Sequence, residues 1–394
     1  MHVLMFIQDL AIIMLVAGLI TILCRRFKQP IVFGYIIAGI IIGPYTPPFS
    51  FISDESTIKI LAELGVIFLM FSLGLEFSLQ KLGKVGFTGL IAAFLEITLM
   101  IWLGYEIGCY FRWSQIDAIF LGAILAISST TIIVKALDEL GMKKENFAQL
   151  IFGILIIEDI FAVIILALLS SIAITGPLQA NDVVVTIIKL LSFLVASFVL
   201  GILLIPRLLS YVATFKNNEV LLISVLGLCF GFCLLVVKLN YSIALGAFMI
   251  GAIIAESKQL NQIENLIGPL RDMFSAIFFV SVGLLFDPKA LIKYTFPIII
   301  ITIAAVLGKI LTCSLGVVLT GRDGRTAMRV GMGLAQIGEF SFIIASLGIT
   351  LKVTSNFLYP IAVAVSAITT LLTPYLIKHS DSFTQYIKKI IPRK

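Results

Sequence analysis

Five ionisable side chains stand inside long apolar stretches of this 394-residue sequence: Glu96, Glu158, Asp159, Lys309 and Glu339. If these stretches cross a membrane, each charge costs at least about 2.5–3.5 kcal/mol, so each residue is a functional candidate by default. Carboxylates at such a depth can bind protons or small cations. An ammonium there can compensate a carboxylate or the partial charge of a helix end.

The adjacent acids Glu158 and Asp159 are the clearest signal, because they lie near the middle of one apolar stretch. Neighbouring residues of a helix point about 100° apart, so we expect the two carboxylates to face different surroundings. One can face an aqueous cavity while the other meets a cation. The alternative is two structural acids, neutralised by protonation or by partners on other helices, but two adjacent buried acids are expensive to keep without a use.

Polar residues interrupt two further apolar stretches, at residues 128–131 (Ser-Ser-Thr-Thr) and 336–339 (Gln-Ile-Gly-Glu). Because hydroxyls hydrogen-bond back to helix carbonyls and can open a helix, we expect two broken helices that cross; ordinary Ser/Thr packing is the alternative. Free helix ends at mid-membrane need compensating charges. We expect Glu339 to balance positive helix ends. Lys309 is expected either to balance negative helix ends or to pair with Glu158.

The composition places these residues in a membrane protein. Apolar residues make up 60% of the chain and charged residues 13%, against about 25% charged in a typical soluble domain. A soluble fold of this length could not bury so much apolar surface, which excludes a cytosolic enzyme, a disordered chain and a fibrous repeat. The five cysteines form no C-x-x-C motif and the two histidines lie at the chain ends. We therefore predict no metal centre, no cofactor and, since the bases are dispersed, no nucleic-acid partner.

The apolar pattern predicts an all-α polytopic membrane protein with about 13 transmembrane helices. The Lys and Arg residues are distributed unequally over the predicted connections, with 20 on one side of the membrane and 6 on the other. By the positive-inside rule, we expect the N-terminus outside and the C-terminus in the cytoplasm. We expect the protein to lie in the inner or plasma membrane of the cell. The predicted segments are 3–24, 30–43, 57–75, 87–111, 117–136, 149–174, 183–206, 220–237, 241–255, 274–286, 294–320, 329–351 and 357–377.

Two sequence matches indicate an internal repeat. Residues 34–43 match 246–255 at an offset of 212, and residues 72–77 match 281–286 at an offset of 209; a chance match between helices rich in Gly and Ile is the alternative. A single span between two six-span halves inverts one half relative to the other, as in many secondary transporters. Glu96 is then the counterpart of Lys309, either structural or protonated and facing a neighbouring helix. The predicted division is a first repeat over 1–174, a linker span over 183–206, a second repeat over 220–377 and a cytoplasmic tail over 378–394.

Taken in order, these motifs resemble the cation–proton antiporter superfamily, in the branch of Kef-type potassium efflux systems and NapA-like sodium–proton antiporters. The resemblance runs through residues 3–377, nearly the whole chain. The segments that carry it are 29–44 (QPIVFGYIIAGIIIGP), 63–66 (ELGV), 72–76 (SLGLE), 128–130 (SST), 158–159 (ED), 278–283 (FFVSVG) and 333–340 (GLAQIGEF).

The resemblance implies a homodimer in membrane lipid, in which each chain has a dimerisation domain and a core domain with crossed broken helices. It implies that the residues of the site divide into two groups. The cation and proton would bind at Asp159, Glu158, Ser129 and Thr130, and the compensating polar and charged groups would be Lys309, Glu339 and Gln336.

The implied function is that of a secondary antiporter, not an enzyme, that exchanges protons for Na⁺ or K⁺ by alternating access at a buried carboxylate. Glu158 stands where Kef-type proteins often have Gln and many sodium–proton antiporters have Asp or Asn, so the preference between Na⁺ and K⁺ stays open. The alternative is a gated potassium efflux system that resembles a channel. Against it, the chain lacks a carbonyl filter of the T-V-G-Y-G type.

Overall fold

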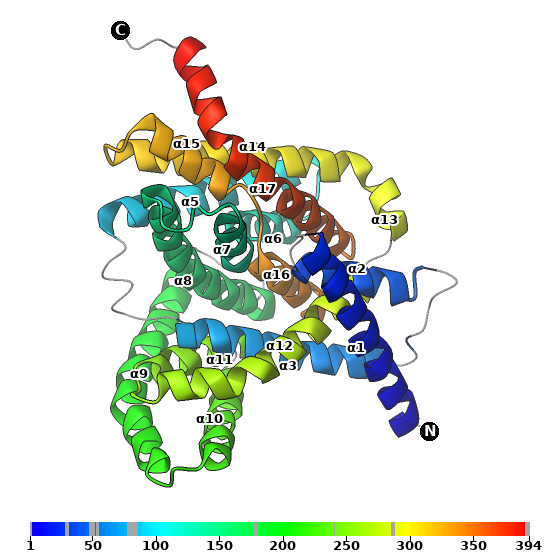
Figure 1. The fold of residues 1–394 in the computed structure, drawn as a ribbon, viewed down its shortest axis with the longest axis vertical. Coiled ribbons are helices and arrows are strands. Elements are labelled where there is room, and N and C mark those ends of the chain that lie inside the picture. Colours follow the sequence, from blue (N-terminus) through cyan, green and yellow to red (C-terminus); the bar gives the residue numbers. More distant parts are fainter. Residues whose placement is uncertain are drawn as a thin grey trace. The chain divides into compact units, whose positions relative to one another are not determined.

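The computed structural model describes residues 2–27, 31–46, 52, 55–76, 86–175, 180–239, 241–284 and 288–390 as helices and their connections (Figure 1). The helices are α1 (His2–Arg26), α2 (Ile31–Ile42), α3 (Glu55–Glu76), α5 (Gly86–Tyr110), α6 (Gln115–Ala126), α7 (Thr130–Glu139), α8 (Asn146–Thr175), α9 (Ala180–Ala213), α10 (Asn218–Lys238), α11 (Ile243–Ala255), α12 (Leu260–Leu284), α13 (Pro288–Lys293), α14 (Thr295–Leu319), α15 (Gly324–Gly333), α16 (Glu339–Thr350) and α17 (Leu358–Ile390).

The helical membrane architecture predicted from composition is confirmed. Eight of the described helices are long and apolar enough to cross a membrane, and shorter apolar helices cover Gln115–Ala126, Ile243–Ala255 and Phe340–Thr350. A helix satisfies its own backbone hydrogen bonds, which is the condition for standing in lipid. The total of thirteen crossings stays a prediction.

Two helices extend well beyond their predicted apolar segments. Helix α12 begins at Leu260 instead of near residue 274, and α17 continues to Ile390, into the segment predicted as a tail. The N-terminal part of α12 contains Arg271, which pairs with Asp272 at 2.9 Å and with Glu76 at 3.7 Å, and all three side chains are at least 37% exposed. Exposed, solvated charges end an apolar segment without ending the helix, which explains the difference.

The helices form two compact units that interleave along the chain. Unit 1 consists of Met1–Lys81 and Val163–Leu285, and unit 2 of Leu82–Ala162 and Phe286–Lys394. Each unit therefore contains helices from both predicted repeats, and the chain passes from one unit to the other within α8. The boundaries of the repeats themselves stay a prediction.

Close backbone contacts between glycines join α2 to α12 and α3 to α11 in unit 1. A Cβ atom on Gly39 would lie 2.8 Å from the Cα of Gly283, and one on Gly251 would lie 3.0 Å from the Cα of Gly74. Glycines allow two helix backbones to approach in this way. The sequence matches pair Gly39 with Gly251 and Gly74 with Gly283, so the two contacts are counterparts of each other. This is the packing that two halves related by a two-fold axis would produce.

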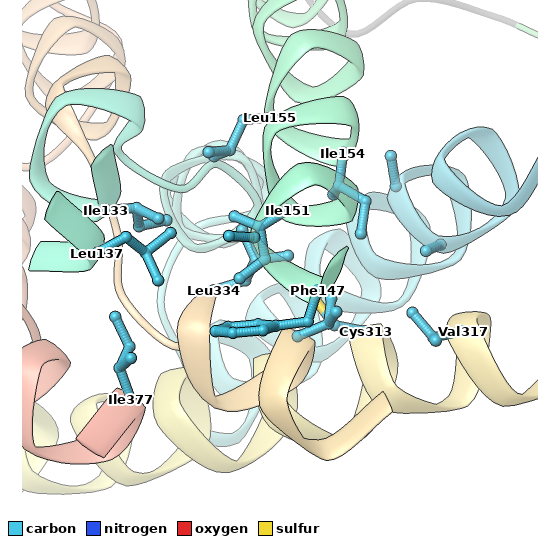
Figure 2. Packing of buried hydrophobic residues seen from close by; sticks show 14 of the residues in the cluster. Ile133, Leu137, Phe147, Ile151, Ile154, Leu155, Cys313, Val317, Leu334 and Ile377 are labelled. Carbon is cyan, nitrogen blue, oxygen red and sulfur yellow. The ribbon is translucent and has the colours of Figure 1, made fainter. Parts of the chain in front are cut away.

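Unit 2 has an apolar core around the N-terminal half of α8 (Figure 2). Phe147, Ile151, Ile154 and Leu155 recur at helical spacing and are buried, so they line one face of α8. The core joins α8 to α7, α14, α15 and α17, which include the elements that carry the polar residues identified above. Its other labelled members are Ile133 and Leu137 of α7, Cys313 and Val317 of α14, Leu334 after α15, and Ile377 of α17.

Candidate functional site

The first predicted helix break is present in unit 2. Helix α6 ends at Ala126 and α7 begins at Thr130, and the residue after α6, Ile127, is extended with φ −111° and ψ 128°. Residues 127–129 are buried, so their backbone groups need partners other than water. The polar pattern at residues 128–131 therefore opens the helix, as expected, instead of only packing against a neighbour.

The second predicted break lies between α15, which ends at Gly333, and α16, which begins at Glu339. The residue before α16, Gly338, is extended with φ −109° and ψ −167°. Helix α17 supports this segment from one side: the hydroxyl of Ser366 donates to the carbonyl of Ile337 at 3.2 Å, and the Ile337 N–H donates to the hydroxyl of Thr369 at 3.4 Å.

The two breaks meet and satisfy each other's backbone groups. The Gly338 N–H donates to the carbonyl of Ile127 at 3.1 Å. The side-chain amide of Gln336 makes two hydrogen bonds with the backbone of Ser129. Its Nε2 donates to the Ser129 carbonyl at 3.1 Å, and its Oε1 accepts from the Ser129 N–H at 3.4 Å. The crossing is therefore a hydrogen-bonded joint between two unwound segments that lie about 210 residues apart in the chain.

The two acids of α8 have different surroundings, as their 100° separation predicts. Glu158 is fully buried, and its Oε2 accepts from the N–H of Ser128 at 2.7 Å. Asp159 is partly exposed, and its Oδ2 accepts from the hydroxyl of Thr130 at 3.4 Å. Both acids thus contact the first break, but only Asp159 of the two has exposed surface.

Lys309 contacts the other side of the first break from α14. Its ammonium pairs with the carboxylate of Glu96, and it donates to the hydroxyl of Ser128 at 2.9 Å and to the carbonyl of Ala126, the last residue of α6, at 3.3 Å. Both Lys309 and Glu96 are fully buried. The lysine thus binds the negative end of a half-helix, which was one of the two roles that the sequence suggested for it.

The other suggested role, a direct ion pair between Lys309 and Glu158, is corrected by the structure. Among the described residues, the ion pair of Lys309 is with Glu96. The reason is the packing of α5 against α14, in which a Cβ on Gly316 would lie 2.5 Å from the Cα of Ala92. Glycine at this contact brings the two helices close enough for Glu96 and Lys309 to meet.

The residue types alone did not identify Glu96 as the partner of Lys309, or Ser128 as the residue that contacts both Glu158 and Lys309. The repeat did contain a signal for the first, because Glu96 and Lys309 are counterparts at an offset of 213. Counterparts that lie close to a two-fold axis meet across it. Glu339 is the first residue of α16, at the positive end of this half-helix, while its side chain lies outside the part that the structure describes.

The arrangement suits the reversible binding of a small monovalent ion. Asp159 offers a carboxylate oxygen beside the hydroxyl of Thr130, and oxygen atoms are the ligands that hard cations prefer. The half-helices α7 and α16 both begin at the crossing, with their positive ends turned toward it, and they offset part of the buried negative charge. A proton and a cation would compete for the same carboxylate here.

Comparison with known proteins agrees with this geometry. The model of the family described as "Sodium/hydrogen exchanger, transmembrane" matches residues 11–378. An Escherichia coli (strain K12) protein, provisionally named cation/proton antiporter YbaL, is 34% identical over 373 residues, which is 92% of this chain and 66%, or about two thirds, of that relative. The Na⁺/H⁺-K⁺ antiporter GerN of Bacillus cereus is 30% identical and covers 95% of this chain and 96% of its own length.

A solved structure has the same fold. The sodium proton antiporter MjNhaP1 of Methanocaldococcus jannaschii superposes with a TM-score of 0.75 at 16% sequence identity, over 98% of this chain and 99% of that one.

Proposed function

Because the chain belongs to the sodium/hydrogen exchanger family, we propose that it is a secondary antiporter that exchanges protons for a monovalent cation, Na⁺ or K⁺, across the membrane. The observation that carries the proposal is the partly exposed carboxylate of Asp159, placed beside Thr130 where two broken helices cross. Relatives named as Na⁺/H⁺ and K⁺ antiporters support both cations as substrates. A gated channel is not favoured, since the relatives bear antiporter names.

In this proposal the exchange takes place on one carboxylate. On the acidic side Asp159 takes up a proton and releases its cation, and on the other side it releases the proton to water and binds a cation. The hydroxyl of Thr130 contacts Asp159, and in this proposal Thr130 and Ser129 supply further oxygen ligands. Gln336 keeps the Ser129 backbone in place, and Lys309 compensates charge behind the break.

Unit 2 contains the whole site, so in this proposal it is the ion-translocation domain, and unit 1 is the dimerisation domain of a homodimer. Alternating access then consists of a movement of one unit against the other, which carries the bound ion without opening a pore. The inverted repeat fits this role, because two halves of opposite orientation offer equivalent inward-open and outward-open states.

The direct test is transport by the purified protein in liposomes that contain a pH-sensitive dye. Addition of Na⁺, K⁺, Li⁺ and Rb⁺ in turn should produce cation-dependent proton movement that saturates with cation concentration, and the ranking of the cations gives the substrate. A flux without saturation and without coupling to a pH gradient would support a channel and overturn the proposal.

A further inference from the structure

Six aromatic side chains form one connected cluster at an end of unit 2. Its members are Tyr110, Phe111, Trp113, Tyr294, Phe296 and Phe357. The rings of Phe111 and Trp113 stack with their centroids 5.3 Å apart. The ring of Phe357 lies 4.7 Å from that of Trp113 and 5.7 Å from that of Tyr294. The cluster therefore joins three parts of the chain that are far apart in the sequence: the end of α5, the start of α14 and the connection between α16 and α17.

This aromatic cluster lies where three long apolar helices begin or end. Helix α5 ends at Tyr110, α14 begins at Thr295 and α17 begins at Leu358, and each is long and apolar enough to cross a membrane. Tyrosine and tryptophan are enriched at the level of lipid headgroups, because one end of the side chain is apolar and the other is polar. Two members of the cluster face outward, since Tyr110 is 71% and Phe296 is 62% exposed. This position fits the headgroup layer of a bilayer.

Four exposed bases accompany the cluster: Arg112, Lys289, Lys293 and Lys352. Arg112 directly precedes Trp113, and the ammonium of Lys293 lies over the ring of Tyr294, 5.1 Å from its centroid. Lys289 lies one turn before Lys293 on α13. These are four of the six Lys and Arg residues on the side of the membrane predicted as outer, where the positive-inside rule favours few bases. Their concentration at one end of unit 2 therefore calls for an explanation.

Asp117 fixes two of these connections to each other. Its carboxylate is buried and accepts from the N–H and the hydroxyl of Ser355 at 2.7 and 2.8 Å, and from the hydroxyl of Ser114 at 2.7 Å. The connection that carries Arg112 is thus held against the connection that carries Lys352, and the charge of Asp117 is used inside the protein.

The surface is basic on balance. Segments 110–114, 288–296 and 351–357 contain the four bases and no Asp or Glu. The net charge stays positive when the acids beside them in the sequence, Glu106, Asp117 and Asp287, are all counted. Within the part of the chain that the structure describes, the ion pairs involve other bases than Arg112 and Lys352. An anion that approaches this end of unit 2 would therefore meet exposed positive charge.

The backbone conformation at Arg112 and Lys352 does not explain why bases stand there. Both residues have a positive φ, of 58° and 57°, in the turn after a helix end where glycine is the usual residue because it has no Cβ. In the same unit Gly141 and Gly321 take this conformation after α7 and α14, on the side predicted as cytoplasmic. Glycine would suit the two outer turns equally well, which indicates that the basic side chains serve a contact outside the chain.

We propose that this aromatic–basic surface, formed by the cluster and the four bases, binds the phosphate groups of anionic phospholipids in the leaflet that it faces. Guanidinium and ammonium groups pair with phosphate, and bases at a membrane surface favour anionic lipids over neutral ones. The exposed rings of Tyr110 and Phe296 meet the apolar part of a lipid, which a free phosphate ion lacks. The inference goes beyond the proposed antiport and does not depend on it.

Trp113 provides a reporter inside this surface. The chain has two tryptophans, Trp102 and Trp113, so Trp102→Phe leaves Trp113 as the single one. The full chain with this change is reconstituted into bilayers of phosphatidylcholine and phosphatidylglycerol, in which one of the two lipids carries brominated acyl chains that quench tryptophan fluorescence. The quenching measures which lipid lies next to Trp113. We expect a preference for phosphatidylglycerol of at least roughly fivefold, the effect of one base at a membrane surface.

Substitutions in the same background test the four bases. Arg112→Gly combined with Lys352→Gly removes two charges at positions where glycine suits the backbone. The Tm of this variant in a neutral detergent should equal or exceed that of its parent, whereas its preference for phosphatidylglycerol should fall toward one. Lys289→Gln combined with Lys293→Gln leaves both turns intact and should lower the preference as well. The matched control is Lys216→Gly, which removes a base with φ 50° after α9 in unit 1 and should leave the preference unchanged.

Three results would overturn the inference. One is equal quenching by the two brominated lipids, and another is a preference that survives in both double variants. The third is an equal loss of preference in Lys216→Gly, which would show a response to the net charge of the whole protein. Inorganic phosphate, added at constant ionic strength, distinguishes a lipid from a free ion. It should leave the preference intact, and a preference abolished by phosphate would assign the surface to the free ion and overturn the lipid.

Discussion

At the scale of single residues, Glu158 and Asp159 are adjacent in sequence but differ in exposure and in hydrogen-bond partner. Glu158 is fully buried and binds a backbone N–H of the first break. Asp159 is partly exposed and contacts the hydroxyl of Thr130. The difference arises from the 100° step of the helix, which gives the two carboxylates different partners and different exposure. The two acids therefore occupy different environments.

We predict that Asp159→Asn abolishes cation-dependent proton flux while the protein still folds. Asparagine has the same size and can accept the Thr130 hydroxyl bond, but it carries no charge and no exchangeable proton. The liposome assay with the pH dye measures the flux, and thermal denaturation in detergent measures stability, with Glu219→Asn, at an exposed position of α10, as the control. Substantial flux in the Asp159 variant would remove this residue from the centre of the mechanism.

We predict that Glu96→Gln and Lys309→Met each destabilise the protein, by about 3–5 kcal/mol if the remaining charge stays ionised, because each change leaves one buried charge without its partner. The double variant should be less destabilised than the sum of the single effects, since neither charge is then left alone. A double-mutant cycle of thermal stability in detergent measures this coupling.

A second pair in unit 2 serves as the control for this cycle. Arg329 and Glu145 are joined at 2.7 Å, and their side chains are 12% and 44% exposed, so their coupling should be smaller than that of the fully buried pair. Additive losses at Glu96 and Lys309 would show that the two buried groups do not stabilise each other.

At the scale of elements, four half-helices replace two continuous helices. The gap between α6 and α7 has three residues and the gap between α15 and α16 has five. Each gap leaves backbone donors and acceptors that must be paired in a water-poor environment. The backbone groups of the two gaps pair with each other and with the side chains of Gln336, Ser128 and Lys309. The crossing is thus required by hydrogen bonding as well as by function.

We predict that Gly338→Ala destabilises the crossing by about 1–3 kcal/mol, the usual cost of an overpacked site, and lowers the transport rate. A Cβ at this position would lie 2.6 Å from the Ser129 nitrogen and 2.7 Å from the Ser128 carbonyl carbon, which are backbone atoms that cannot turn away. Gly231→Ala in α10 is the control, since a Cβ there meets nothing within 4 Å and alanine favours a helix. Equal stability of both variants would argue against the close contact.

The start of α15 offers a test outside the apolar segments. Asp323 caps this helix by accepting from the N–H groups of Arg325 and Thr326 at 3.0 and 3.1 Å and from the Thr326 hydroxyl at 2.7 Å. The Thr326 hydroxyl bond, followed by the backbone N–H bonds, lowers the pKa of Asp323 below its ordinary value. The stabilisation is therefore present at neutral pH and is lost as the pH falls through the pKa of the folded state.

We predict that Asp323→Ala lowers the free energy of unfolding by about 1 kcal/mol at neutral pH, as expected for loss of an N-cap. The difference in the free energy of unfolding between this variant and the unaltered protein should become smaller under acid conditions, because protonated Asp323 no longer stabilises the helix start as a carboxylate. Tm measurements over a pH series check this. Asp323→Asn should retain most of the cap and show less pH dependence, and a constant difference between Asp323→Ala and the unaltered protein at every pH would contradict the assignment.

At the scale of the whole molecule, each compact unit combines segments that are far apart in the sequence. Unit 2 takes Leu82–Ala162 from the first half and Phe286–Lys394 from the second. The breaks that form the crossing come one from each half, and so do Glu96 and Lys309. A site that is assembled from both halves is complete only when the two segments of unit 2 have folded together.

We predict that the C-terminus lies in the cytoplasm and the N-terminus outside, from the excess of Lys and Arg on the cytoplasmic connections. Green fluorescent protein fused after residue 394 should therefore fluoresce, and alkaline phosphatase fused at the same place should be inactive. A phosphatase fusion within the connection between α5 and α6, on the opposite side, is the control and should be active. The reverse pattern would invert the predicted topology.

The sequence by itself determined the features that depend on local chemistry. Hydropathy predicted the helices, the polar groups at 128–131 and 336–339 predicted where two of them open, and the adjacency of Glu158 and Asp159 on one helix predicted that the two carboxylates face different surroundings. These features follow from the cost of placing polar groups in lipid, which acts at each position independently. The pairing of Lys309 with Glu96, the linking role of Ser128 and the interleaved units were decided by tertiary structure. They depend on how closely and at what angle α5, α6, α8 and α14 pack, and contacts between residues more than 180 positions apart are set by that packing and not by the spacing of residues along the chain.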